Sequence, residues 1–215
     1  MPVAADAFPW SAVVRVQIAG VSRCTGFLLD AQHVLTAAHC LYSARVRHLL
    51  WAGAVHVLAG YSMGRYANHA VPDSYRVLPG YDPARPAASL GVDAALLHLP
   101  RPLSLPGGVR GLALAFSVPP GTPAMLGGYE SDRAEILLAD QACRLMGYDQ
   151  DGAAHPLRQH DCAATFGTSG APLLVPTPQG WAVAGLQVAA LVGQAGGRVV
   201  PASTLAVLVG GSGSK

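Results

Sequence analysis

The sequence predicts an all-β fold. Short apolar runs recur along the 215 residues, and no segment sustains the 3.6-residue period of an amphipathic helix. Turn-forming residues, among them 25 Gly and 17 Pro, separate these runs. About twelve short strands with such punctuation are typical of a β-barrel or a β-sandwich.

The expected strands follow one another from the beginning of the chain. Each is a short apolar run bounded by turn residues, and together they cover residues 12–18, 25–29, 33–36, 55–59, 75–78, 94–99, 124–128, 134–138, 142–147, 172–175, 181–190 and 198–201. Only residues 202–209 are expected to form a helix. The Pro- and Gly-rich stretch 100–111, followed by 117–123, divides the strands into two sets. We expect the two halves to pack on each other, because this connection is too short for a free linker.

Composition excludes several classes of protein. Charged residues make up 12% of the chain and apolar residues 51%, which rules out disorder driven by charge and low hydrophobicity. No apolar run approaches the roughly 18 residues that cross a bilayer. The net charge is +2 and the Arg residues are scattered, so no basic face for nucleic acid is expected. Residues 210–215 have the composition of an added tail and are excluded from the fold.

The four cysteines, Cys24, Cys40, Cys143 and Cys162, include no C-x-x-C pair, which argues against a zinc ribbon or a thioredoxin-like redox site. They form two pairs that are each close in sequence, and this suits two local disulfides in an oxidising compartment. The alternative is four buried free thiols. Residues 1–4 lack the pattern of a signal peptide, and we expect that Met1 replaces a removed export sequence. A secreted or periplasmic protein is therefore expected.

Residues 166–172, with the sequence FGTSGAP, are the most specific local signal. Ser169 lies between glycines two residues before it and one after it. Such small residues permit a tight turn in which backbone amides point at one spot beside the hydroxyl, as an acyl-transfer nucleophile requires. By itself the string also fits an ordinary Gly- and Ser-containing loop.

Two further segments carry acid–base chemistry. Residues 34–40, VLTAAHC, form a β-type run that ends at His39, and a neighbouring disulfide would hold this histidine as a general base. In residues 91–99, GVDAALLHL, the single acid Asp93 precedes an apolar run. Burying Asp93 without a partner would cost several kcal/mol, and His39 is a candidate donor. The alternatives are a structural histidine and a turn aspartate.

In the order His, Asp, Ser, these segments resemble the chymotrypsin-like (trypsin-like) serine peptidases. Residues 8–11 (FPWS) and 79–82 (PGYD) are similar to the family's flanking segments, and the resemblance covers about residues 8–209. It implies two packed six-stranded antiparallel β-barrels, about residues 8–105 and 120–201, with the active site in their cleft and a short C-terminal helix. The Cys24 and Cys40 pair fits the disulfide that closes the family's histidine loop.

The resemblance also assigns roles. His39, Asp93 and Ser169 would form the catalytic triad, and the amides of Gly167 and Ser169 would form the oxyanion hole. The implied function is a serine endopeptidase that works through an acyl-enzyme. The alternative is a catalytically silent protease-fold protein that only binds.

Two departures from the animal enzymes narrow the prediction. Thr168 stands directly before the nucleophile, where animal trypsin-like members have an Asp, so the sequence is more similar to the exported bacterial branch that includes glutamyl endopeptidases. Trypsin has an acid at the pocket base where this chain has Ala163, and glutamyl-specific relatives have a His where it has Gln187. We expect a pocket for an uncharged side chain of small or medium size, lined by Ala163, Ala164, Phe166, Gln187, Val188 and Ala190.

The partners follow from this assignment. We expect a monomer that acts on protein or peptide substrates and uses no cofactor, metal, nucleic acid or membrane. His48, His56, His69, His155 and His160 show no metal-ligand spacing. His33 and His98 are interpreted as structural histidines, and Asp73 and Asp82 as turn acids.

Overall fold

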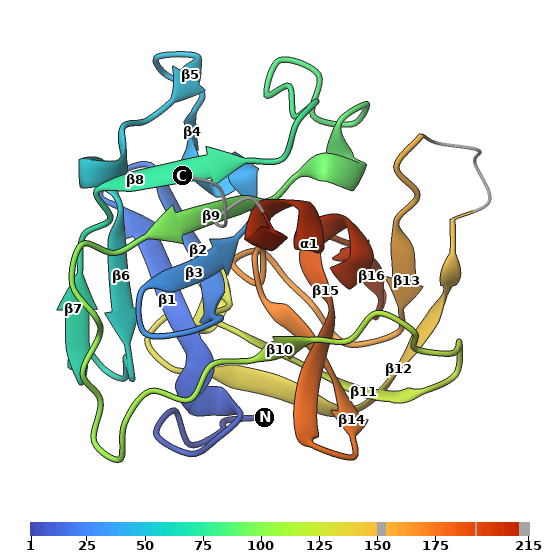
Figure 1. Ribbon diagram of the computed structural model, residues 1–215. Coiled ribbons are helices and arrows are strands. Elements are labelled where there is room, and N and C mark those ends of the chain that lie inside the picture. The colour runs from blue at the N-terminus through green and yellow to red at the C-terminus, as the bar shows by residue number, and fades with distance from the viewer. Residues whose placement is uncertain (150–153, 192, 211–215) are drawn as a thin grey trace.

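The computed structural model describes residues 1–149, 154–191 and 193–210 (Figure 1). The strands of the first half are β1 (Val13–Ile18), β2 (Ser22–Leu28), β3 (His33–Thr36), β4 (Tyr42–Ser43), β5 (His48–Leu49), β6 (His56–Ala59), β7 (Asn68–Ala70), β8 (Ser74–Val77) and β9 (Ala95–His98). Those of the second half are β10 (Ala113–Leu114), β11 (Pro123–Gly128), β12 (Leu138–Tyr148), β13 (Arg158–His160), β14 (Pro172–Thr177), β15 (Gly180–Ala190) and β16 (Gly197–Pro201).

Helical segments are short. One α-helix, α1 (Ala202–Gly210), follows the last strand within the described residues, as expected for residues 202–209. Single 3₁₀ turns occur at η1 (Trp10–Ala12), η2 (Ala38–Leu41), η3 (Ala52–Ala54), η4 (Leu90–Val92) and η5 (Ser131–Arg133). None of these described helices is long and apolar enough to pass through a membrane.

The strands form two large sheets, which confirms the predicted fold class. The first has the order β7-β6-β1-β2-β3-β9-β8, and β4 and β5 form a separate hairpin. The second has the order β10-β15-β14-β11-β12-β13-β16, and an additional β15–β16 pairing closes six of its strands into a barrel. In detail each sheet has seven paired strands rather than six, because β7 and the parallel strand β10 add to the edges.

The prediction of a strand at residues 134–138 is wrong. A turn occupies this segment, in which the Ile136 amide donates to the Arg133 carbonyl at 3.3 Å, and the strand β12 begins only at Leu138. The short strands β4, β5, β7, β10 and β13 were not expected. Each has two or three residues, so it shows no sequence periodicity and exists through pairing with a neighbour. The tail proposed for residues 210–215 lies, apart from Gly210, outside the described residues.

Apolar side chains from both sheets pack into a shared core, and polar contacts also join the halves. Arg15 on β1 is buried and donates from Nη1 to the Ala134 carbonyl at 2.8 Å. The Tyr129 hydroxyl donates to the Tyr61 carbonyl at 3.2 Å. Two disulfides, Cys24–Cys40 and Cys143–Cys162, each lie within one half. The sheets therefore meet as one packed unit, and the predicted site residues lie at their junction.

Candidate active site

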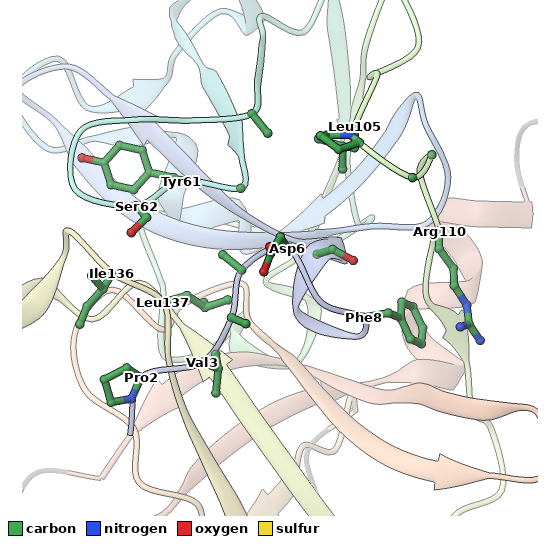
Figure 2. Close-up of a pocket in the computed structure, with 18 residues that line it drawn as sticks. Pro2, Val3, Asp6, Phe8, Tyr61, Ser62, Leu105, Arg110, Ile136 and Leu137 are labelled. Atoms are coloured by element: carbon green, nitrogen blue, oxygen red, sulfur yellow. The ribbon is translucent and has the colours of Figure 1, made fainter.

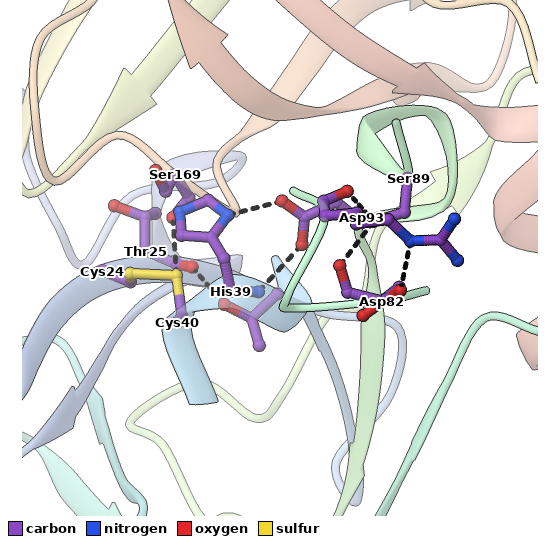
Figure 3. Close-up of polar contacts among 10 residues, drawn as sticks. Cys24, Thr25, His39, Cys40, Asp82, Ser89, Asp93 and Ser169 are labelled. Carbon is purple, nitrogen blue, oxygen red and sulfur yellow. Dashed lines mark hydrogen bonds and ion pairs between the residues drawn. A yellow bond between two sulfur atoms is a disulfide. The ribbon is translucent and has the colours of Figure 1, made fainter. Parts of the chain in front are cut away.

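His39 is positioned by the end of β3 and the turn η2. Its neighbour Cys40 forms a disulfide with Cys24 of β2, which fixes this turn against the sheet (Figure 3). The imidazole Nδ1 lies 2.5 Å from Oδ2 of Asp93, and the His39 backbone amide donates to Asp93 Oδ1 at 2.8 Å. Both carboxylate oxygens of Asp93 therefore hold the same histidine, and the imidazole Nε2 makes no contact with this carboxylate.

Asp93 follows η4 and precedes β9, whose Ala95 pairs with Thr36 of β3. This pairing brings the carboxylate beside His39, although the two residues are far apart in sequence. Asp93 is only 3% exposed. A buried carboxylate without partners would be strongly destabilising, and the two hydrogen bonds to His39 supply them.

The Ser169 loop is pressed against the first sheet. Gly170 has a φ of +86°, and a Cβ there would lie 2.0 Å from the Thr25 carbonyl oxygen, so only glycine fits this approach. The Thr25 amide donates to the Ser169 carbonyl at 2.9 Å, and Cys40 Sγ lies 4.0 Å from the same oxygen. The loop is thus fixed beside the disulfide that holds His39.

In Figure 3 the imidazole of His39 lies between Ser169 and Asp93. Ser169 is half-buried, and in the described part of the chain its hydroxyl makes no hydrogen bond with His39. Hydrogen bonds of this kind are commonly long in unliganded enzymes and tighten when substrate binds. The three side chains named from the sequence are therefore brought to one place in the order that proton transfer requires.

Hydrogen bonds fix the peptides on either side of Gly167. The Phe166 carbonyl accepts from the Ser131 amide at 2.6 Å and from its hydroxyl at 2.9 Å. The Gly167 carbonyl accepts from the Thr25 hydroxyl at 2.8 Å. Among the described residues, the amides of Gly167 and Ser169 have no acceptor. Two amides of one loop are thus left free to donate to a ligand, as an oxyanion hole requires.

Sequence reasoning missed Thr25 and Ser131. The Thr25 hydroxyl also accepts from the Tyr129 amide at 2.9 Å, so this fully buried side chain joins β2 to the serine loop and to the end of β11. Threonine is common in strands, so its sequence context carried no signal of this role. Only the packing of the two sheets shows it.

Thr168 is buried and satisfied locally. Its hydroxyl donates to the Thr165 carbonyl at 2.6 Å. The amino-terminal residues lie elsewhere, where the Met1 amine donates to the Ala139 carbonyl at 2.9 Å and the Val3 amide to Leu137 at 3.2 Å. Animal trypsin-like members have an Asp at this position, directly before the serine, and that acid needs a cationic partner. Thr168 needs none, because its hydroxyl makes a neutral hydrogen bond.

The predicted pocket residues are unequally exposed. Phe166 is 83% exposed and Ala163 is also exposed, whereas Gln187 is only 1% exposed. Of the other predicted residues, Ala164 and Val188 are buried and Ala190 is half-buried. Phe166 thus lies at the surface, and Gln187 lies inside the barrel.

His160 holds the Gln187 amide. The Cys162 amide donates to His160 Nδ1 at 3.2 Å, which assigns the proton to Nε2, and Nε2 then donates to Gln187 Oε1 at 2.7 Å. Gln187 Nε2 donates in turn to the Ala189 carbonyl at 2.9 Å. Burial lowers the pKa of His160, so this histidine stays neutral. The group at this position is therefore uncharged.

A cavity of about 680 Å³ lies apart from these residues, under the amino-terminal segment (Figure 2). Its lining includes Phe8, Tyr61, Leu105, Arg110 and Leu137. None of the predicted triad or pocket residues lines it. Hollow volume alone thus does not identify the chemical centre of this molecule.

The sequence matches the trypsin family over residues 1–202. The chain belongs to that family. Mouse serine protease 56 is 32% identical over 157 residues, which is 66% of this chain and 24% of that protein. The cercarial protease of Schistosoma mansoni is 32% identical over 121 residues, 51% of this chain and 44% of the relative. The chain thus spans less than half the length of these relatives.

Solved structures share the fold. A Glu endopeptidase has a TM-score of 0.76 at 18% identity, over 100% of this chain and 96% of the other. Human heparin binding protein has a TM-score of 0.76 at 20% identity, over 98% and 94%. The family is that of the chymotrypsin-like serine proteases, as the motifs indicated. The two sequence relatives come from mouse and from Schistosoma mansoni, and assignment to the bacterial branch stays a prediction.

Proposed function

We propose that this trypsin-family protein is a serine endopeptidase that hydrolyses peptide bonds through an acyl-enzyme. One observation carries the proposal: the buried Asp93 holds His39 through both carboxylate oxygens, and the Ser169 loop is bonded to the strand beside this pair. Substrates are proteins or peptides. The two disulfides fit an extracellular protein, and we propose that it is secreted or periplasmic.

The chemistry needs only groups that this chain provides. The Ser169 hydroxyl attacks the peptide carbonyl while His39 Nε2 accepts its proton, and His39 then gives this proton to the departing amine. A water molecule repeats the sequence on the acyl-enzyme and releases the acid product. Asp93 keeps the Nδ1 proton in place and stabilises the imidazolium that forms in each half of the reaction.

The amides of Gly167 and Ser169 would stabilise the oxyanion. The Phe166 carbonyl is bonded to Ser131, and the Thr168 carbonyl accepts from the Ala171 amide at 2.8 Å, so the two peptides that carry these amides are held before substrate arrives. Donors that need no reorganisation are the most effective in lowering the barrier. Loss of one such donor in other enzymes reduces turnover by about 10² to 10³.

For the first specificity pocket we propose an uncharged side chain of small or medium size. Ala163 has no charge, and the Gln187 amide is held by a neutral His160. An Arg, Lys or Glu side chain would therefore meet no counter-ion from these residues. Cleavage-site profiling on a denatured proteome tests this, and a strong preference for a charged residue contradicts it.

Activity should not need a cleaved amino terminus that pairs with the residue before the nucleophile. The hydroxyl of Thr168 is already bonded to Thr165, and it carries no charge to attract an amine. Changing the residues before Phe8 should therefore leave turnover within a few-fold. Strict dependence on one terminal residue would show that another acid serves this purpose.

The alternative function is a protease-fold protein that binds without catalysis. The absence of a formed bond between the Ser169 hydroxyl and His39 is the observation in its favour within the described residues. A fluorophosphonate probe separates the two functions. Labelling of the wild type, but not of Ser169→Ala or His39→Ala, supports the endopeptidase. An unlabelled wild type that is folded by circular dichroism supports the binding protein.

A further inference from the structure

We propose that His33 and His98 form a binding site for one Zn²⁺ ion on the first sheet, away from the candidate active site. The two residues are directly opposite each other in the antiparallel β3–β9 pair, so their side chains leave the same face of the sheet. Their ring centroids lie 5.4 Å apart with an interplanar angle of 55°. Two imidazoles at this spacing are close enough to share one ion with Zn–N bonds of about 2.0–2.1 Å.

Each imidazole has its other nitrogen occupied by a carboxylate. His33 Nδ1 lies 2.8 Å from Asp30 Oδ2, and His98 Nδ1 lies 2.8 Å from Asp73 Oδ1. A carboxylate there accepts the Nδ1 proton and leaves Nε2 as a lone-pair donor. This carboxylate–histidine arrangement is the usual support of a zinc-binding imidazole, because it fixes the tautomer and raises the basicity of the ligand.

Both carboxylates lie at the surface, but further hydrogen bonds hold them in place. Asp30 Oδ1 also accepts from the amides of Gln32 at 2.7 Å and His33 at 2.9 Å. Asp73 accepts from the Ser74 hydroxyl at 2.9 Å, and its own amide donates to the His98 carbonyl at 3.1 Å. Both supports are thus held before an ion binds.

The two histidines remain accessible to solvent, with side-chain exposures of 33% for His33 and 42% for His98. Water can therefore complete a four-coordinate shell around an ion held by two protein nitrogens. Imidazole is a ligand that suits zinc better than magnesium or calcium, which prefer oxygen. These properties favour Zn²⁺ over the harder cations.

Two other groups in the described chain are weaker candidates. His56 and His69 also lie close together, but His56 Nδ1 is hydrogen-bonded to His69 Nε2 at 2.8 Å, so one nitrogen of each ring is already used. Neither ring is bonded to a carboxylate among the described residues. Cys24 and Cys40 lie near His39, but their sulfurs are joined in a disulfide and are not thiolate ligands. The His56 and His69 pair provides a matched control within the same molecule.

The zinc site would connect β3 and β9, the two strands that lead to His39 and Asp93. His33 and His98 form one end of the β3–β9 pair, and Thr36 and Ala95 form the other end, beyond which the chain reaches His39 and Asp93. An ion that binds only the folded protein stabilises it in proportion to its occupancy. We therefore expect Zn²⁺ to raise the thermal midpoint without touching the reacting groups.

Calorimetric titration with ZnCl₂ tests the proposal on protein stripped with a chelator, at neutral pH, where imidazoles bind metal. Ser169→Ala serves as the parent to exclude self-cleavage, so the result does not depend on the proposed function. The parent should bind one ion. His98→Gln should lose this binding, and Asp73→Asn should weaken the affinity by about 10- to 100-fold. His69→Gln should bind as the parent does.

Each outcome bears on the proposal. Thermal midpoints measured with chelator show that the variants fold, and ¹⁵N shifts of the imidazoles identify Nε2 of His33 and His98 as the ligands. Parent protein that binds no zinc, or His98→Gln that binds as tightly as the parent, would overturn the site. Loss of zinc binding in His69→Gln would show that the ion binds to His56 and His69 instead. An unchanged zinc affinity in Asp73→Asn would show that the Asp73 carboxylate does not support His98 as a ligand.

Discussion

The pair His39–Asp93 and the pair His98–Asp73 consist of the same two side chains, joined through the same imidazole nitrogen. The nitrogen–oxygen distances are 2.5 Å and 2.8 Å, and both pairs adjoin the strands β3 and β9. Their surroundings differ. The side chain of Asp93 is 4% exposed, whereas that of Asp73 is 47% exposed. A His–Asp contact by itself therefore does not make a catalytic centre.

Burial and neighbours explain the difference. Water and salt screen the exposed pair, so it contributes little to stability. Around Asp93 the low dielectric strengthens each interaction with the imidazole. The Ser169 loop is bonded to Thr25 beside His39, and in the proposed mechanism it provides the hydroxyl that the imidazole deprotonates. No acyl-transfer nucleophile is assigned beside His98.

The largest contrast should come from removing each histidine. His39→Ala should reduce kcat/KM by about 10⁶, as loss of the base does in a comparable triad. His98→Ala, the matched control, should stay within a few-fold of the wild type, because its imidazole takes no part in the reaction. Initial rates on a fluorogenic peptide chosen from the cleavage profile measure both. Comparable losses in the two variants would contradict the assignment of the dyad.

Replacing each carboxylate should give the next largest contrast. Asp93→Asn should lower kcat by about 10⁴, because the amide holds the imidazole in the wrong tautomer. Asp73→Asn should leave kcat unchanged while it weakens zinc binding. Steady-state kinetics with chelator present separate these effects. An Asp93→Asn variant with nearly full activity would show that the buried carboxylate is only structural.

Thr25 tests whether the peptides near Gly167 must be held in advance. Thr25→Val keeps the shape of the side chain but leaves the Gly167 carbonyl and the Tyr129 amide without their partner. We expect a loss of about 10² in kcat with little change in KM, since a misaligned oxyanion donor acts on the transition state. Thr25→Ser retains the hydroxyl and should recover most of the activity. Equal kinetics for the two variants would indicate that the hydroxyl has no catalytic effect.

The smallest effect concerns stability and pH. Burial lowers the pKa of His160 in the folded protein, so the unfolded chain binds more protons between the folded pKa and about 6.5. The free energy of unfolding should therefore fall as the pH decreases below about 6.5, by up to about 1.4 kcal/mol per pH unit from this group. Urea unfolding should show that the free energy of unfolding depends less steeply on pH in His160→Asn than in the wild type. The control His98→Asn should keep the contribution of His160 to this slope. An unchanged slope in His160→Asn would show that another group causes the acid instability.

Much of the candidate site could be predicted because each of its reactive residues lies in a short, recognisable sequence segment. The strings around His39, Asp93 and Ser169 each combine a reactive residue with the small or apolar neighbours that its place requires. The all-β class followed from short apolar runs and frequent turns. Three motifs in order then indicated a junction of two sheets, which the packing of the Ser169 loop on Thr25 matches.

The remaining features depend on contacts between distant segments. Thr25 touches Gly167 and Tyr129 only after the two sheets meet. The sequence indicates only structural histidines for His33 and His98, and the register of β3 and β9 places them opposite each other. The segment 134–138 is apolar enough for a strand, but the turn after η5 occupies it. Single-sequence patterns carry none of this long-range information.

The two hydrogen bonds of Thr25 to the serine loop have a consequence for the order of protein synthesis. The ribosome releases Thr25, His39 and Asp93 well before Ser169. A chain at that stage has a proton-transfer pair but no nucleophile, and Thr25 has no Ser169 or Gly167 to bond. The proposed cleavage of peptide bonds would thus need the later strands to have been made and docked. Because the proposed reacting groups come from both halves of the chain, the complete site would form only after the second half has folded against the first.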